Sequence, residues 1–124
     1  MRSFDIIGLQ ETWSEDQNDF KGWLSGYTVR TKEGSRRSKH GHCSGGIAVF
    51  FKDSIFQGIS EINSTFNHAL SFVLKASYFG LNTDIILICS YLPPEGSFVY
   101  NTGTDDNYDG ISLLQEEICN ITSV

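Results

Sequence analysis

The sequence predicts an incomplete α/β sandwich in which a mixed sheet carries a helix on one face. Short runs rich in Val, Ile, Phe and Tyr alternate with polar turns, a pattern typical of strands. One near-continuous apolar run, residues 84–91, is typical of a strand buried on both faces. Apolar residues near the C-terminus recur at helical spacing. The second face of the sheet is expected to need another sheet, which the chain lacks.

Length and composition favour one compact intracellular domain. The chain has 124 residues, 40% of them hydrophobic and 13% aromatic, which is enough for a core. Its three cysteines are an odd number and indicate no disulfide framework. No segment has the length and apolarity of a membrane span, and residues 1–5 do not lead into a signal peptide. We therefore expect no membrane contact, and no obligate protein partner is indicated.

The first half of the chain predicts four strands. Residues 4–9 are apolar and too few for a helix, so they indicate a buried strand that ends just before Glu11. Residues 27–31 alternate between polar and apolar side chains, as a half-buried strand does. Residues 45–51 have strand composition, and the polar turn after them predicts a hairpin with a further strand at residues 55–62.

The second half predicts another hairpin and a helix. Residues 70–77 and 84–91 are joined by a turn containing Gly80, and Pro93 and Pro94 end the later strand. Asp109 is a good N-cap residue for the helix that follows. The apolar positions that predict this helix are Ile111, Leu114, Ile118 and Ile121.

Positive charge is concentrated in one stretch, although the net charge is -6. Beyond Asp53 the only Lys or Arg is Lys75. Two interpretations of the basic stretch stay open: it is a solvated loop, or it contacts the phosphate backbone of a nucleic acid. In the second case the contacting candidates are Arg36, Arg37 and Lys39, with Arg30, Lys32, His40 and His42 nearby.

Glu11 lies in the segment Asp-Ile-Ile-Gly-Leu-Gln-Glu-Thr-Trp, residues 5–13, where a strand gives way to a loop. From such a position a carboxylate can hold a hard cation at the rim of a sheet. A single carboxylate at a strand end is more often just a surface residue. The segment alone therefore leaves both interpretations open.

This segment resembles the signature strand of the endonuclease/exonuclease/phosphatase superfamily, in which the Glu of Gln-Glu-Thr binds the catalytic divalent metal. Three further motifs resemble the family's in the same order, and the likeness is greatest to the endonuclease domains of non-LTR retrotransposons. They are Ser-Gly-Gly-Ile-Ala-Val-Phe at residues 44–50, Ile-Cys-Ser-Tyr-Leu-Pro-Pro at residues 88–94 and Leu-Leu-Gln-Glu-Glu-Ile at residues 113–118.

The resemblance implies a DNase I-like fold, with Glu11 as a ligand of Mg²⁺ or Mn²⁺. It also implies a catalytic role for Tyr91, which matches the family tyrosine close to the scissile phosphate. DNA is then the partner of the full-length protein, which would be nuclear if it is a retroelement protein. Residues 1–124 would form a partial domain, lacking the family's first strand and its C-terminal half, and we expect the chain alone to be inactive.

Two alternatives to a DNA endonuclease remain. A phosphoesterase of the same superfamily that acts on a phospholipid or an inositol phosphate would share every motif. Residues 105–116 also fit the calcium-loop pattern, with Asp105, Asn107, Asp109 and Glu116 in place, so a non-enzymatic calcium-binding module is possible. Acidic residues ahead of a helix are also explained by capping and the helix dipole. The group His40, His42 and Cys43 lacks the fourth ligand of a structural zinc site.

Overall fold

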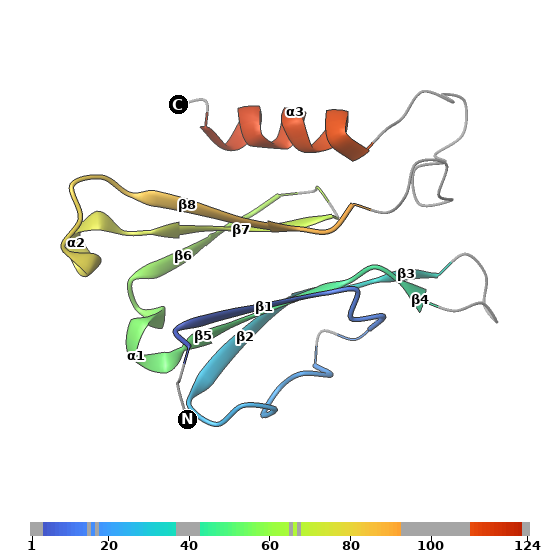
Figure 1. Ribbon diagram of the computed structural model, residues 1–124, viewed down its shortest axis with the longest axis horizontal. Helices are drawn as coiled ribbons and strands as arrows, with labels where there is room; N and C mark the ends of the chain where they lie inside the picture. The colour runs from blue at the N-terminus through green and yellow to red at the C-terminus, as the bar shows by residue number, and fades with distance from the viewer. Residues whose placement is uncertain are drawn as a thin grey trace.

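Two three-stranded sheets face each other in the computed structural model, which describes residues 4–14, 16, 18–36, 43–64, 66, 68–92 and 110–122. Figure 1 shows the sheets as two layers with one helix outside the second layer. The first sheet has the order β1 (Ile6–Gln10), β5 (Ile47–Lys52), β2 (Tyr27–Lys32). The second has the order β6 (Ile59–Ile62), β7 (Ala69–Leu74), β8 (Ile85–Ser90). The remaining elements are β3 (Ser35–Arg36), β4 (Cys43–Ser44), α1 (Asp53–Phe56), α2 (Ala76–Phe79) and α3 (Gly110–Thr122).

The core forms around β5, which is buried on both of its faces. Alternate side chains of a strand point to opposite faces of the sheet. Ile47, Val49 and Phe51 therefore face the second sheet, where Leu70 and Phe72 pack against them. On the other face, Ala48 and Phe50 pack against Phe20, which belongs to the segment between β1 and β2. The first sheet is thus covered on both sides along its central strand.

The class predicted from the sequence is confirmed, but the single mixed sheet is wrong. The strands divide between two sheets, and every pairing among the described strands is antiparallel. The hairpin predicted between residues 45–51 and 55–62 is also wrong, because α1 leads the chain from β5 in one sheet to β6 in the other. Both partners of β5 precede it in the sequence. The hairpin prediction paired β5 with the strand that follows it, so it missed them.

The second predicted hairpin is confirmed by the pairing of β7 with β8. Its register places Ala69 opposite Ser90 and Leu74 opposite Ile85. The prediction that the later strand is buried on both faces is wrong, since Ile85 and Ile86 are 46% and 38% exposed. β8 is an edge strand within the described part of the chain, and so is β1, which is only partly buried. An apolar run does not by itself distinguish an edge strand from a central one.

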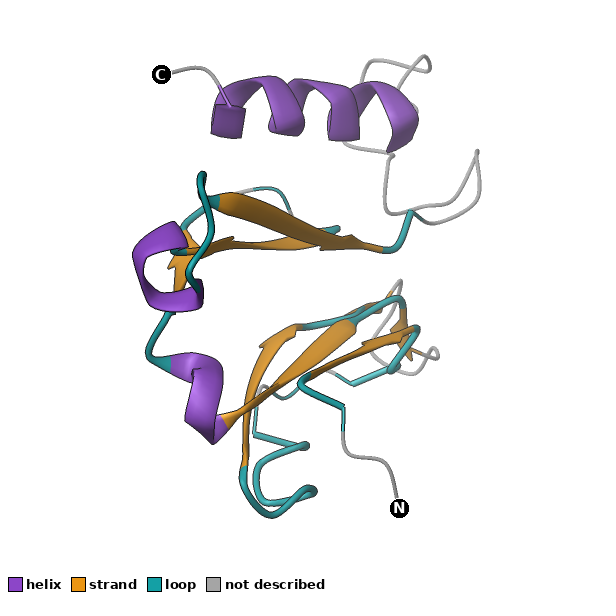
Figure 2. Ribbon diagram, turned by 60° about the vertical axis from the view of Figure 1, so that its left-hand side comes forward, coloured by secondary structure: helices purple, strands orange, loops and turns teal. Residues whose placement is uncertain are grey.

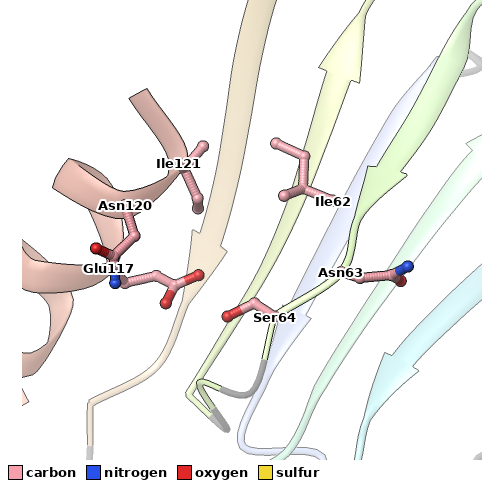
Figure 3. A pocket seen from close by; sticks show the side chains of 6 residues that line it. All are labelled: Ile62, Asn63, Ser64, Glu117, Asn120 and Ile121. Carbon is pink, nitrogen blue, oxygen red and sulfur yellow. The ribbon is translucent and has the colours of Figure 1, made fainter. Parts of the chain in front are cut away.

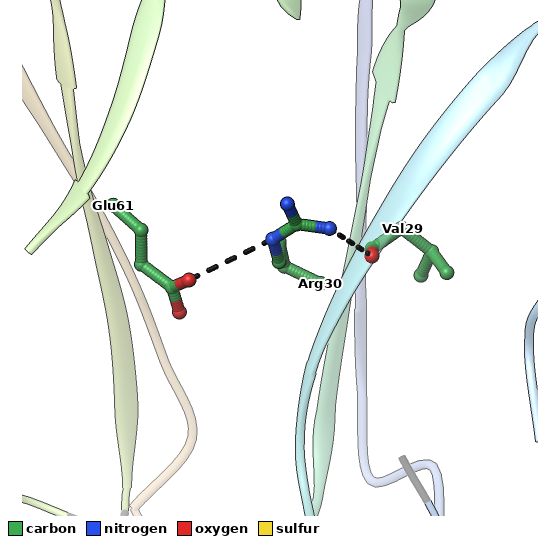
Figure 4. Close-up of polar contacts among 3 residues, drawn as sticks. All are labelled: Val29, Arg30 and Glu61. Carbon is green, nitrogen blue, oxygen red and sulfur yellow. Dashed lines mark hydrogen bonds and ion pairs between the residues drawn. The ribbon is translucent and has the colours of Figure 1, made fainter. Parts of the chain in front are cut away.

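An ion pair joins β2 of the first sheet to β6 of the second. Arg30 of β2 lies 3.7 Å from the Glu61 carboxylate of β6, as Figure 4 shows, and its Nη1 donates to the Val29 carbonyl. The Arg30 guanidinium also stacks 4.8 Å from the centroid of the Phe56 ring. Because the ion pair is partly exposed, it contributes little stability, but it helps to align the facing sheets.

The predicted C-terminal helix is confirmed as α3, which lies outside the second sheet in both Figure 1 and Figure 2. Its buried face matches the predicted one only in part: Leu114 and Ile121 are half-buried, but Ile111 and Ile118 are exposed, and Glu117 is buried. Figure 3 shows the Glu117 side chain directed into a concavity of about 550 Å³ beside Ser64, so the carboxylate lies in a partly polar setting. Asp109 lies outside the described residues. No helix in the described part of the chain is long and apolar enough to cross a membrane.

Candidate functional site

Glu11 and Tyr91 meet in space. The Tyr91 hydroxyl donates a hydrogen bond of 2.7 Å to Oε1 of Glu11, across a sequence separation of 80 residues. Glu11 directly follows β1, and Tyr91 directly follows β8, so each sheet supplies one of the two groups. The sequence predicted these residues separately, from two different motifs. The fold joins them in one exposed site at the ends of two facing edge strands.

Neighbouring contacts fix the two strand ends relative to each other. The Gln10 side-chain amide donates to the Ser90 carbonyl, and the Tyr91 amide donates to the His68 carbonyl at 3.1 Å. A cavity of about 410 Å³ adjoins this bridge and is lined by Gly8, Leu9, Gln10, Ile47, Ile88, Cys89 and Ser90. Gln10 was not singled out from the sequence, because nothing in the sequence shows which carbonyl lies opposite a given amide.

Glu11 occupies a bulge in the sheet. Gln10 lies opposite Ile47, but beyond it the Thr12 amide donates to the Gly46 carbonyl at 3.3 Å and the Trp13 amide to the Gly45 carbonyl at 2.9 Å. The pairing has therefore shifted by one position, and Glu11 is the extra residue on its strand. Its φ of 52° is left-handed, as is the φ of 56° at Trp13. A bulge of this kind redirects a side chain at the end of a strand.

The glycine pair opposite the bulge allows this close approach. Gly46 has φ 96°, and a Cβ atom there would overlap Oγ1 of Thr12. Gly45 has φ 79° and lies under the Tyr91 ring, where a Cβ would be 3.9 Å from Cδ1. The Gly-Gly motif thus has a local physical role: it leaves room for the Thr12 side chain and for the loop that carries Glu11.

The other predicted site residues are less fully described. Arg36 lies in β3, which pairs with β4, and only its backbone is described. Arg37, Lys39, His40, His42 and the calcium-pattern residues 105–109 lie outside the described residues. Glu116 is exposed on α3. The positions of these groups relative to Glu11 therefore stay predictions.

One of the described residues, Glu11, is suited to binding a divalent metal. Glu11 offers an exposed carboxylate, which is the donor that Mg²⁺ and Mn²⁺ prefer. Among these residues no group of three or more His, Cys, Asp and Glu side chains converges on a metal position. Mg²⁺ is commonly held by one or two carboxylates while water and substrate phosphate complete its shell. Glu11 can supply one such ligand.

Two titratable groups near the site have shifted pKa values. Burial raises the pKa of the Cys89 thiol, which keeps it protonated and unsuited to nucleophilic attack. Burial lowers the pKa of His68 below its ordinary value of 6.5, because desolvation disfavours the imidazolium form. The backbone carbonyl of His68 also accepts a hydrogen bond from the Tyr91 amide, which places this half-buried side chain near the site.

The stability of the protein is expected to fall as the pH drops below about 6.5. The unfolded chain takes up a proton on His68 near that pH, while the folded chain resists protonation. The unfolded state then binds more protons, so the free energy of unfolding rises with pH up to this value. Urea unfolding of the protein and of His68→Gln across this range measures the effect. The variant should show a shallower pH dependence, and equal slopes would contradict the assignment.

Comparison with known proteins now gives a family. The model of the Endonuclease/Exonuclease/phosphatase family matches residues 1–115. No curated protein and no solved structure was found to match. The two facing sheets and flanking helices agree with a partial DNase I-like domain. With Glu11 and Tyr91 joined at the rim of those sheets, the chain belongs to the endonuclease/exonuclease/phosphatase family.

Proposed function

We propose that the protein is a divalent-metal-dependent endonuclease that cleaves DNA phosphodiesters, with Mg²⁺ or Mn²⁺ as its metal. The observation that carries this proposal is the hydrogen bond between Tyr91 and Glu11. It places the candidate metal ligand beside a phenol within a family of phosphoester-cleaving enzymes. The motif order favours a retroelement origin and, with it, a nuclear location.

Each of the two residues has a distinct task in this proposal. The Glu11 carboxylate would hold the metal, which when bound neutralises charge that builds up on the phosphate. The Tyr91 hydroxyl is a donor that can orient either the Glu11 carboxylate or a phosphate oxygen, because one rotation of the hydroxyl changes its acceptor. The hydrogen bond of 2.7 Å between the phenol and the Glu11 carboxylate supports this assignment.

We further propose that residues 1–124 supply only part of a catalytic domain. Hydrolysis needs a base that activates water and a group that stabilises the leaving oxygen, besides the metal. Among the described residues no group of three or more His, Cys, Asp and Glu side chains converges beside Glu11. The isolated chain is therefore expected to be inactive, and activity is to be measured with the product of the complete reading frame that encodes it.

In the complete protein, Glu11→Gln should lower the rate of metal-dependent nicking of supercoiled plasmid by about 100- to 1000-fold. This is the range expected when one preorganised electrostatic contact of the transition state is lost. The amide keeps the size of the side chain but removes the charge that attracts a divalent cation. Initial nicking rates in Mg²⁺, in Mn²⁺ and in a chelator give the measurement.

Glu116→Gln is the matched control. Glu116 is an exposed carboxylate on α3, so this substitution is expected to leave the nicking rate unchanged.

Tyr91→Phe should lower the nicking rate by up to about 100-fold through loss of positioning alone. Nicking that persists in Glu11→Gln would refute the assignment. Hydrolysis of a phosphoinositide but not of plasmid would favour the lipid phosphoesterase alternative, and tight calcium binding abolished by Glu116→Gln would favour the calcium module.

A further inference from the structure

Trp13 is a large aromatic side chain that lies in solvent close to Glu11. It is 65% exposed, although tryptophan is usually well buried. Within the described residues its ring has no aromatic or cationic partner. The only other tryptophan, Trp23, is exposed to a similar degree, 61%, but its ring packs edge-on against Phe20 with ring centroids 4.6 Å apart. An accessible aromatic face thus lies beside the candidate metal ligand.

The backbone of the bulge holds Trp13 in this position. Thr12 is half-buried over Gly46, while Glu11 and Trp13 on either side of it are both exposed. The left-handed φ of Trp13 costs free energy, which the hydrogen bond from its amide to the Gly45 carbonyl helps to offset. Glu11 and Trp13 are the two non-glycine residues with positive φ in the described part of the chain. Such local strain is found most often at functional positions.

The spacing between Glu11 and Trp13 suits neighbouring parts of one DNA strand. Two residues span at most about 7 Å. Successive nucleotides of one strand rise by about 3.4 Å along the helix axis. If a phosphate is held at Glu11, the backbone of Trp13 therefore lies within one or two nucleotides of it, and its exposed side chain is close enough to meet a neighbouring base.

We infer that Trp13 stacks on an unpaired nucleobase next to the phosphate held at Glu11, so that the protein favours DNA that is single-stranded or locally unstacked at its target. This inference rests on the proposed function. An exposed aromatic ring binds the face of a base, and that face is accessible only when the base has left the duplex stack. Stacking is nearly independent of sequence, because every base has such a face.

The surroundings of Trp13 disfavour an anionic lipid surface. Asp16, Asn18 and Asp19 are exposed in the segment that follows it. Membrane-surface segments combine apolar side chains with Lys and Arg, whereas these carboxylates would be repelled by anionic headgroups. The same carboxylates repel the phosphates of a DNA strand, so the attraction at Trp13 has to come from stacking of its ring on a neutral base.

The two tryptophans allow a site-specific fluorescence test. Trp23→Phe leaves Trp13 as the only tryptophan, and Trp13→Phe leaves Trp23, which precedes β2 at the opposite end of the first sheet. The 124-residue chain, which is expected to be inactive alone, is titrated in Mg²⁺ with an oligothymidylate and with an abasic oligomer of the same length. The oligothymidylate should quench the Trp13 emission and leave the Trp23 emission unchanged. The abasic oligomer should quench neither.

Affinity supplies a second readout. Trp13→Ala should weaken binding of the oligothymidylate by roughly 5- to 150-fold, while Trp23→Ala should not change it. Equal quenching by the abasic oligomer, quenching of Trp23 instead, or quenching only by phosphatidylinositol vesicles would overturn the inference. The proposed function is tested separately: Glu11-dependent nicking without Trp13 quenching refutes only this inference, and quenching without nicking refutes only the hydrolase assignment.

Discussion

Phe72→Ala is expected to lower the free energy of unfolding by about 3–5 kcal/mol, the range typical of truncating a buried aromatic residue. Phe72 is 1% exposed on β7, and its ring meets that of Phe51 edge-on at 4.7 Å. Its removal deprives the interface between the two sheets of a central contact and leaves a cavity. Small domains are stable by only about 5–15 kcal/mol, so the loss is a large fraction of the total. Urea unfolding followed by circular dichroism measures it.

Phe4→Ala is the matched control for this prediction. Phe4 is 64% exposed, and the bond that it accepts from the Tyr27 hydroxyl involves its backbone carbonyl, which alanine retains. The same truncation there should change stability by no more than about 0.5 kcal/mol. Phe72→Leu keeps most of the apolar volume, so its loss in free energy of unfolding should lie between those of Phe72→Ala and Phe4→Ala. If Phe72→Ala cost no more than Phe4→Ala, the two sheets would not pack as described.

Local patterns in the sequence were sufficient to locate most elements and to predict the hairpin of β7 with β8, but not to pair the strands of the first sheet. The alternation at residues 27–31 and the helical spacing behind α3 are short-range signals, and both elements form where they were predicted. The partners of β5 are a long-range property. Its apolar character indicated burial, but not that β1 and β2 flank it or that α1 takes the next strand to another sheet.

The buried face of α3 also depends on distant parts of the chain, which local patterns do not show. Leu114 and Ile121 of the predicted stripe are half-buried, but Ile111 and Ile118 are exposed and Glu117 is buried. Which face of a helix is covered depends on the surface that it meets. Here that surface includes the concavity beside Ser64, with room for a carboxylate. Spacing within the helix carries no information about this partner.

Glu11 was predicted through resemblance rather than through any property of its own. Its charge and its place after a strand fit many surface residues. The sequence could not show that it forms a bulge, because a left-handed φ is uncommon for Glu. The one local sign of unusual backbone was the pair Gly45 and Gly46, which lies far from Glu11 in the sequence but opposite it in the sheet. The most informative test of the site therefore concerns Gly46.

Gly46→Ala is expected to destabilise the protein by about 2–4 kcal/mol, from the left-handed φ of 96° together with overpacking. The new Cβ would overlap Oγ1 of Thr12, and it would come within 3.3 Å of the Gly34 amide nitrogen and 3.5 Å of that of Trp13. Thr12 can rotate, but the Gly34 amide can move only with its loop, whereas the approach to Trp13 is an ordinary van der Waals contact. The bulge carrying Glu11 should shift, and since a displacement of about 1 Å can cost about 100-fold in rate, nicking should fall as well.

Gly26→Ala separates strain from steric overlap. Gly26 also has a left-handed φ, of 82°, but a Cβ there meets nothing within 4 Å, so its substitution should cost only about 1–2 kcal/mol. In the double variant Thr12→Ala/Gly46→Ala the loss of stability should fall toward that of Gly26→Ala, because the overlap is relieved while the backbone strain remains. Equal losses in Gly46→Ala and Gly26→Ala would show that the bulge does not press on the glycine pair. A nicking rate unchanged by Gly46→Ala, in a protein destabilised by it, would show that the position of Glu11 does not depend on Gly46.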